Sequence, residues 1–89
     1  MRGIITVLGH DRVGIIAKVC TYLADHNINI LDVSQTIVDG YFNMIMVADI
    51  SASTTGFVEA VTDLENIGLD LGVQIKLQHE DIFNSMHRI

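Results

Sequence analysis

The chain has 89 residues and no Pro-rich, Ser-rich or charged linker, so it has room for one compact domain. Its 5 basic and 11 acidic residues give a net charge of −6, which disfavours nucleic acid and anionic membranes as partners because both repel acidic proteins. No apolar run approaches the ~20 residues that cross a bilayer. We therefore expect a soluble protein with no nucleic-acid or membrane partner.

The cysteine and hydrophobic contents indicate how so small a domain is stabilised. Cys20 is the only cysteine, and the N-terminus does not resemble a signal peptide, so we expect no disulfide and a cytoplasmic location. A domain of this size buries only roughly 60% of the surface that its unfolded chain exposes. With 49% hydrophobic residues and a mean hydropathy of +0.42, the chain is predicted to form a homodimer or higher homo-oligomer.

The first part of the chain predicts a central strand followed by an amphipathic helix. Arg2–Leu8 is apolar and β-branched on both faces, as in a strand covered on both sides. From Val13 to His26 the apolar residues recur at helical spacing, and Asp11 is the predicted N-cap. The predicted buried stripe consists of Ile15, Ile16, Val19, Cys20 and Leu23.

Two further strands, Asn29–Val38 and Tyr41–Ile50, flank Asp39-Gly40, a pair typical of a type I′ hairpin turn. The turn places Val38 opposite Tyr41 and thereby fixes which side chains share a face. The predicted core face holds Leu31, Val33, Ile37, Phe42, Met44, Met46, Ala48 and Ile50, and the other face holds Asp32, Ser34, Thr36, Asn43, Ile45 and Val47. Gln35 falls on the core face, which requires either a bulge or hydrogen-bond partners near the sheet edge.

The last part predicts a helix at Phe57–Leu71, ended by Gly72, and a half-buried strand from Val73 to Leu77. The helix stripe is Phe57, Ala60, Val61, Leu64, Ile67, Gly68 and Leu71, opposite the solvated Glu59, Asp63, Glu65 and Asn66. The tail, residues 80–89, has Ile82, Phe83, Met86 and Ile89 at helical spacing and is predicted to form a docked helical segment. Residues 1–89 are thus expected to form one domain that includes this tail.

The order strand, helix, hairpin, helix, strand predicts an α+β fold, the ferredoxin-like βαββαβ sandwich. In this arrangement both helices cover one face of a four-stranded antiparallel sheet. The other face is polar at Ser34 and Thr36 but apolar at Tyr41, Ile45 and Val47. Such a mixture favours self-association over exposure to water.

The turn from Gly9 to Ile16 is the segment most informative about function. A helix N-terminus presents free N–H groups and the positive end of the helix dipole, and a glycine in its first turn lets a carboxylate approach the backbone. His10 and Arg12 are placed to complete such contacts. The alternative is that Asp11 merely caps the helix and Gly14 relieves crowding under a neighbouring strand.

Two segments, Asp11–Val19 (DRVGIIAKV) and His26–Gln35 (HNINILDVSQ), resemble the ACT domain. The similarity is greatest to small free-standing ACT proteins, which share SQT at Ser34, YFxM at Tyr41 and IFxxMxxI at Ile82. Val13 replaces a proline that is often found there, which removes a rigidifier but not the site.

The resemblance implies that an amino acid or another small metabolite binds between two copies, at the first turn of one and the second strand of its neighbour. The implied contact residues are His10, Asp11, Arg12, Val13, Gly14 and Ile15, with Asn29 reaching across the interface. The ligand carboxylate would meet the N–H groups near Gly14, and its ammonium would need acceptors such as Asn29, Asp32 or backbone carbonyls.

The resemblance further implies a regulatory module without catalytic residues or a cofactor, acting on the oligomer or on a separate, unidentified protein. An interaction domain without a ligand is the main alternative. An acylphosphatase-like enzyme would use Arg12 and Asn43, but Asp11 would place a negative charge in its cradle and the glycine-rich loop is missing. An RNA-binding sheet would need positive charge and stacking aromatics on the open face.

Other reactive side chains are predicted to be structural. The four histidines are not in a cluster with ligand spacing, so no metal site is expected. Cys20 falls on the buried helix stripe and is predicted to be a core thiol.

Overall fold

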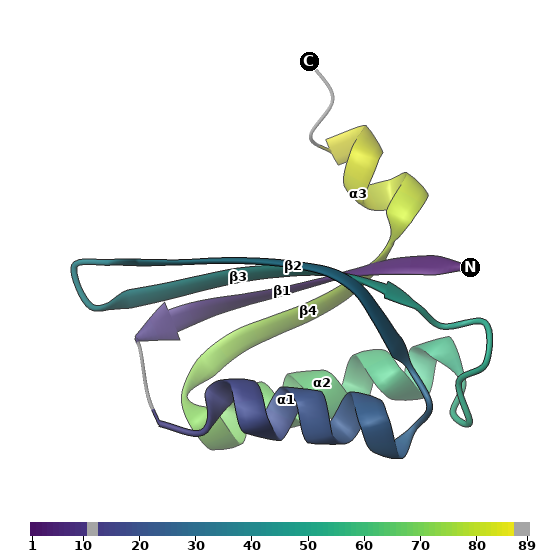
Figure 1. Ribbon diagram of the computed structural model, residues 1–89, viewed down its shortest axis with the longest axis horizontal. Helices are drawn as coiled ribbons and strands as arrows, with labels where there is room; N and C mark the ends of the chain where they lie inside the picture. Colours follow the sequence, from purple (N-terminus) through teal and green to yellow (C-terminus); the bar gives the residue numbers. More distant parts are fainter. Residues whose placement is uncertain (11–12, 87–89) are drawn as a thin grey trace.

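Figure 1 shows the computed structural model, which describes residues 1–10 and 13–86. The elements in chain order are β1 (Arg2–His10), α1 (Ile15–Asp25), β2 (Asn29–Val38), β3 (Tyr41–Asp49), α2 (Phe57–Leu71), β4 (Val73–His79) and α3 (Glu80–Met86). The strands form an antiparallel sheet in the order β2-β3-β1-β4. Helices α1 and α2 lie along one face and α3 lies on the other (Figure 1). The predicted ferredoxin-like α+β fold is confirmed.

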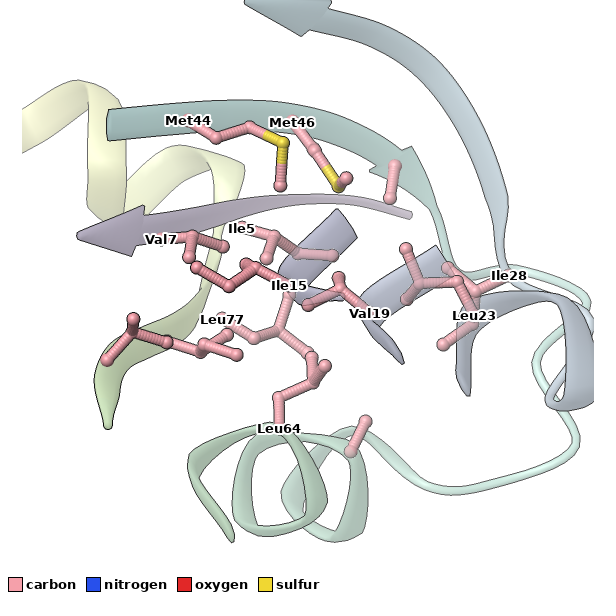
Figure 2. Close-up of a cluster of buried hydrophobic side chains, with 14 of the residues drawn as sticks. Ile5, Val7, Ile15, Val19, Leu23, Ile28, Met44, Met46, Leu64 and Leu77 are labelled. Carbon is pink, nitrogen blue, oxygen red and sulfur yellow. The ribbon is translucent and has the colours of Figure 1, made fainter. Parts of the chain in front are cut away.

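The hydrophobic core fills the space between the sheet and the pair of helices. Side chains from β1, β3 and β4 point toward α1 and α2, which supply the opposite wall (Figure 2). The almost fully buried members with the largest side chains are Ile5, Ile15, Leu23, Met44, Met46, Leu64, Val7 and Val19. Each such side chain contributes about 1.5–3 kcal/mol of burial free energy, so this cluster fixes which face of the sheet is covered.

The hairpin between β2 and β3 has the predicted turn. Asp39 and Gly40 both have positive φ angles, 52° and 81°, as a type I′ turn requires, and Val38 pairs with Tyr41. A register shift lies between Ile30 and Asp32 and leaves Leu31 without a partner in the ladder. The bulge thus lies away from Gln35, which stays opposite Met44.

Strand β2 is the edge of the sheet, and the prediction that its apolar residues belong to the core is wrong. Leu31, Val33 and Ile37 are 47%, 44% and 56% exposed. On β3, by contrast, the predicted core residues from Phe42 to Ala48 are buried. Strand β2 is the outermost strand of the sheet and β3 lies inside it, so the helix layer covers the apolar face of β3 and leaves that of β2 exposed. Gln35 needs no buried partner, because it is exposed as well.

The two helices depart from prediction at three positions. Helix α1 has Gly14 as its N-cap residue, so the predicted start at Val13 and the N-cap at Asp11 are wrong; Asp11 and Arg12 lie outside the described residues. Ile16 is 41% exposed because Ile15, Val19 and Leu23 form the buried line, about 100° away around the helix. Asp63, predicted to be solvated, is half-buried and accepts a hydrogen bond from Tyr22.

Helix α3 confirms a helix in the tail, but its packing is only partly as predicted. It contacts β1 and β4 on the open face, where Ile4 is only 5% exposed, and Arg2 Nε lies 3.3 Å from Glu80 Oε2. Phe83 is half-buried. Ile82 is 56% exposed, so the prediction that it docks is wrong. The side chain of Met86 and residue Ile89 lie outside the described part of the chain.

Candidate functional site

The predicted binding turn lies at the end of the sheet where β1 gives way to α1. His10 is the last residue of β1, and its ring lies 4.6 Å from the ring of Tyr41, the first residue of β3, at an interplanar angle of 30°. Val13 is fully exposed. Ile15 is buried in the core, so its side chain is not available to a ligand and only its backbone can take part.

Gly14 shapes the start of α1. Its φ of 94° lies in the left-handed region, which glycine adopts without strain, and no side chain of the described residues caps the helix. A Cβ atom at Gly14 would meet no described atom within 4 Å. The prediction that Gly14 relieves crowding under a strand is therefore wrong, because open space lies beside it. A helix start that none of the described side chains caps, with open space beside it, is a geometry that accepts an anion.

Asn29 lies at the end of the sheet opposite to His10. The paired residues Asn29, Asp49 and Arg2 form one end of the sheet, whereas Val38, Tyr41 and His10 form the other. Eight residue steps along β1 separate the two ends, a distance of about 26 Å at a rise of about 3.3 Å per residue. Asn29 therefore lies far from His10 within one chain, while His10 and Gly14, which are four residues apart in sequence, border different grooves.

Two grooves adjoin this end of the molecule. One, of about 450 Å³, lies between the end of β1 and the C-terminus of α2, and the other, of about 470 Å³, runs along α1 beside α2. The first is lined by Leu8, Gly9, His10, Tyr41, Gly68, Leu69, Gly72, Val73 and Gln74, and the second by Gly14, Ala17, Lys18, Thr21, Tyr22, Asp25 and Ile67. Gly14 and His10 thus each border a concave surface large enough for a small molecule.

The second groove contains a cation that the sequence analysis overlooked. Lys18 lies one turn after Gly14, and the backbone N–H of Lys18 donates to the carbonyl oxygen of Gly14 at 2.9 Å. Residues four apart share one side of a helix, so the spacing of Gly14 and Lys18 was a usable signal. The positive charge of the exposed Lys18 adds to the attraction of the helix start for a carboxylate.

A polar cluster joins α1 to α2 beneath the same groove. The Tyr22 hydroxyl donates to Asp63 Oδ2 at 2.7 Å, and the Tyr22 ring stacks on His26 at 4.2 Å. Burial, together with the adjacent Asp63 carboxylate, raises the pKa of the Tyr22 phenol above its usual value. The phenol therefore stays protonated and donates the hydrogen bond that joins α1 to α2.

The described residues do not assemble a catalytic or metal centre of the kinds considered from the sequence. Asn43 is exposed on the open face, between Leu8 and Thr36, whereas α1 lies on the other face, so Asn43 and the start of α1 do not form one cradle. Arg12, its suggested partner, lies outside the described residues. The described residues contain no group of three or more His, Cys, Asp or Glu side chains that could hold a metal ion, and Cys20 is half-buried. No helix of the described chain is long and apolar enough to cross a bilayer.

Comparisons with known proteins agree with this architecture. The family model of the ACT domain matches residues 3–78. A UPF0237 protein of Bifidobacterium longum is 57% identical over 88 residues, covering 99% of this chain and 98% of the relative. Among solved structures, an ACT domain protein from Streptococcus pneumoniae superposes with a TM-score of 0.80 at 40% identity and 93% coverage of both chains. A formyltetrahydrofolate deformylase from Pseudomonas syringae, at 25% identity and a TM-score of 0.80, matches 88% of this chain with 27% of its own length.

Proposed function

Because the chain belongs to the ACT domain family, whose domains are typically ligand-binding and regulatory, we propose that it binds an amino acid as a homo-oligomeric regulatory module and catalyses no reaction. The start of α1 at Gly14, where no described side chain caps the helix and no described atom lies within 4 Å of an added Cβ, is the observation that carries this proposal. We propose that the whole chain acts as one domain in the cytoplasm and signals to a separate protein.

The described groups suit the carboxylate of an amino acid better than its ammonium. The first-turn N–H groups after Gly14 supply hydrogen-bond donors, and Lys18 supplies a positive charge. His10, Asp11, Arg12 and Val13 complete the set implied by the family resemblance. An ammonium needs oxygen acceptors, and Asn29 is the acceptor that the resemblance implies.

A second copy can supply Asn29 if the two β2 strands pair with each other. Strand β2 has a free edge, which is a template for pairing with another strand. In an antiparallel β2–β2 pair related by a two-fold axis, the Asn29 end of one copy lies beside the Val38 end of the other. That end also holds His10 and the start of α1, so a shared site would contain both halves of the predicted set.

Pairing of the two β2 strands would also cover apolar side chains of β2 that are exposed in the single chain. Val33 and Ile37 lie on the helix side of the sheet, opposite Met46 and Phe42, and Ile16 is exposed on α1. In the joined sheet these residues of both copies lie on the same side, near the two-fold axis. Burial there would favour the pair that completes the ligand site.

A thermal-shift screen against the amino acids tests the proposal. A ligand present at 100 times its dissociation constant stabilises the folded protein by about 2.7 kcal/mol. We expect at least one amino acid to raise the melting temperature. If no amino acid does so at millimolar concentration, the amino-acid proposal fails and the interaction domain without a ligand becomes the better description.

Calorimetric titration of variants tests the position of the site. Gly14→Leu should abolish binding because its side chain occupies the space beside the helix start. Gly40→Leu is the matched control, since Gly40 also has a positive φ and open space around it but lies in the hairpin turn. Equal loss of binding in both variants would indicate backbone strain and not a site at Gly14.

A separate pair of variants tests whether Asn29 of a second copy contributes to ligand binding. Asn29→Ala should weaken binding about tenfold, as expected for the loss of one hydrogen bond worth about 1.4 kcal/mol. Asn66→Ala removes an exposed asparagine from α2 and should leave binding unchanged. Unchanged binding by the folded Asn29→Ala variant would remove Asn29 from the proposed site.

A further inference from the structure

The open face of the sheet carries an apolar patch that the fold itself leaves uncovered. Leu8, Val38, Tyr41 and Ile45, here called the open-face patch, are 50%, 63%, 52% and 39% exposed. They lie together because Val38 pairs with Tyr41, while Leu8 is a diagonal neighbour of both Tyr41 and Ile45 across β1 and β3. Contiguous exposed apolar surface of this kind marks a contact site.

Helix α3 covers the other end of the same face. It contacts β1 and β4 where Ile4 is almost buried, and Figure 1 shows it rising from the sheet on the side away from α1 and α2. Within β1, therefore, Ile4 is covered and Leu8 is not. The patch begins where the cover from α3 ends.

The charges around the open-face patch favour a partner as acidic as this chain. The three cross-strand rows that hold the patch contain Lys76 and His10 but no Asp or Glu, although the chain has 11 acidic residues and a net charge of −6. Two copies of an acidic protein repel each other least where neither presents a carboxylate. The three rows that hold the open-face patch form such a surface, whereas the exposed Asp32 lies in the next row of the same face.

The shape of the face also fits a second copy. A twisted sheet packs well on another sheet of the same twist, with the strands aligned within about 30°. Four strands about 4.8 Å apart and about 26 Å long give the whole face, including the end that α3 covers, a footprint of about 500 Å², which is less than the ~800 Å² per partner of a standard interface. Ile82 of α3 is exposed at the end of the face opposite the patch, so a two-fold axis across the strands sets α3 of each copy beside the patch of the other.

We propose that the open face is a second self-association surface, on which two copies pack sheet against sheet with the open-face patch at the contact. It differs from the β2 edge invoked for the ligand site, and it goes beyond the proposed function because it requires no ligand. Used together, the two surfaces build a tetramer, a pair of edge-joined dimers stacked face to face. The modest footprint makes the face contact the weaker one, so assembly is expected to depend on protein concentration in the micromolar range.

Sedimentation velocity without any ligand tests this surface. Ile45→Glu places a carboxylate in the patch of each copy and should reduce the sedimenting mass to half that of the wild type at the same concentration. Val58→Glu is the matched control, because Val58 is 71% exposed on α2 and lies on the other side of the molecule. The control should keep the wild-type mass.

The outcomes decide the proposal independently of the ligand screen. Equal mass for Ile45→Glu and the wild type, equal reduction in both variants, or a monomeric wild type at 100 µM would overturn it. If circular dichroism shows that Ile45→Glu is unfolded, Ile45→Thr, which keeps the β-branched shape, must reduce self-association for the proposal to stand. A failed ligand screen would leave these expectations intact, whereas an intact face contact with no ligand would refute only the proposed function.

Discussion

Strands β2 and β3 are the two arms of one hairpin and have similar sequence patterns, but their apolar residues end up in different environments. Phe42 of β3 and Ile37 of β2 are paired and lie on the same face of the sheet, yet Phe42 is 2% exposed and Ile37 is 56% exposed. The same contrast holds for Met46 and its partner Val33. The difference is one of position, since β3 lies inside the sheet and β2 lies at its edge.

The contrast shows that alternation along a strand reports the face of a side chain but not whether anything covers that face. Helix pairs in this fold lie under the middle of the sheet, and α2 packs most closely on β4, at the edge opposite β2. An edge strand is a template for pairing with another chain. The exposed apolar residues of β2 are therefore consistent with the proposed association.

The strongest way to test the contrast is to truncate the two members of one cross-strand pair. Phe42→Ala should lower the free energy of unfolding by about 3–5 kcal/mol because it leaves a cavity in the core. Ile37→Ala should lower it by no more than about 1 kcal/mol at concentrations where the protein is monomeric, because the side chain is already in water. Urea unfolding of both variants gives the comparison.

Varying the protein concentration shows whether Ile37 stabilises the single chain or a contact with a second copy. If β2 is covered by a second copy, the cost of Ile37→Ala should grow as the wild type associates and its melting temperature rises. If Ile37→Ala lowers the free energy of unfolding as much as Phe42→Ala does, at every protein concentration, the two strands do not differ as described.

Local signals predicted much of the fold. The Asp39-Gly40 turn and the register that it sets were predicted because two adjacent positive φ angles favour this pair of residues. The end of α2 at Gly72 was predicted because its C-cap needs a positive φ, here 73°. These features depend on a few neighbouring residues, so one sequence suffices to find them.

Features that depend on distant parts of the chain were missed. The exposure of β2 follows from strand order, and the half-buried position of Asp63 follows from Tyr22, 41 residues earlier in the chain. At the site, the glycine in the turn was identified, but its role was not: Gly14 is needed for its φ of 94° and is itself the N-cap residue of α1. The separation of Asn29 from His10 became visible only with the register of three strands.

Strand β1 offers the same contrast on the open face, where α3 covers Ile4 but not Leu8. Truncation after Gln78 removes α3 and should lower the free energy of unfolding by about 2 kcal/mol, the cost of exposing one large aliphatic side chain. Asn84→Ala keeps α3, changes only an exposed side chain and is the control, with little change expected. Thermal melts of the truncated chain and of the control measure the difference, and equal melting temperatures would mean that α3 does not stabilise the sheet.

The smallest expected effect concerns the hydrogen bond between Tyr22 of α1 and Asp63 of α2, in the helix layer that leaves β2 exposed. Tyr22→Phe removes the hydrogen bond to Asp63 and should lower the free energy of unfolding by about 1 kcal/mol at neutral pH. Tyr41→Phe removes the only other tyrosine hydroxyl, which is on an exposed residue, and should have little effect. Chemical denaturation of the two variants gives the comparison.

The pH dependence tests the same contact in a second way. The folded state raises the pKa of Tyr22 above its ordinary value of 10.0, chiefly by burial and then through Asp63, so the folded protein holds this proton more tightly than the unfolded chain. The stabilisation is complete below about pH 10 and is lost as the pH rises from there toward the folded-state pKa, because the unfolded chain then releases the proton first. Wild type and Tyr41→Phe should lose stability over this range, and Tyr22→Phe should lose less. An alkaline loss of the same size in Tyr22→Phe would assign it to other groups and would leave the Tyr22–Asp63 contact without a measurable role in positioning the helices.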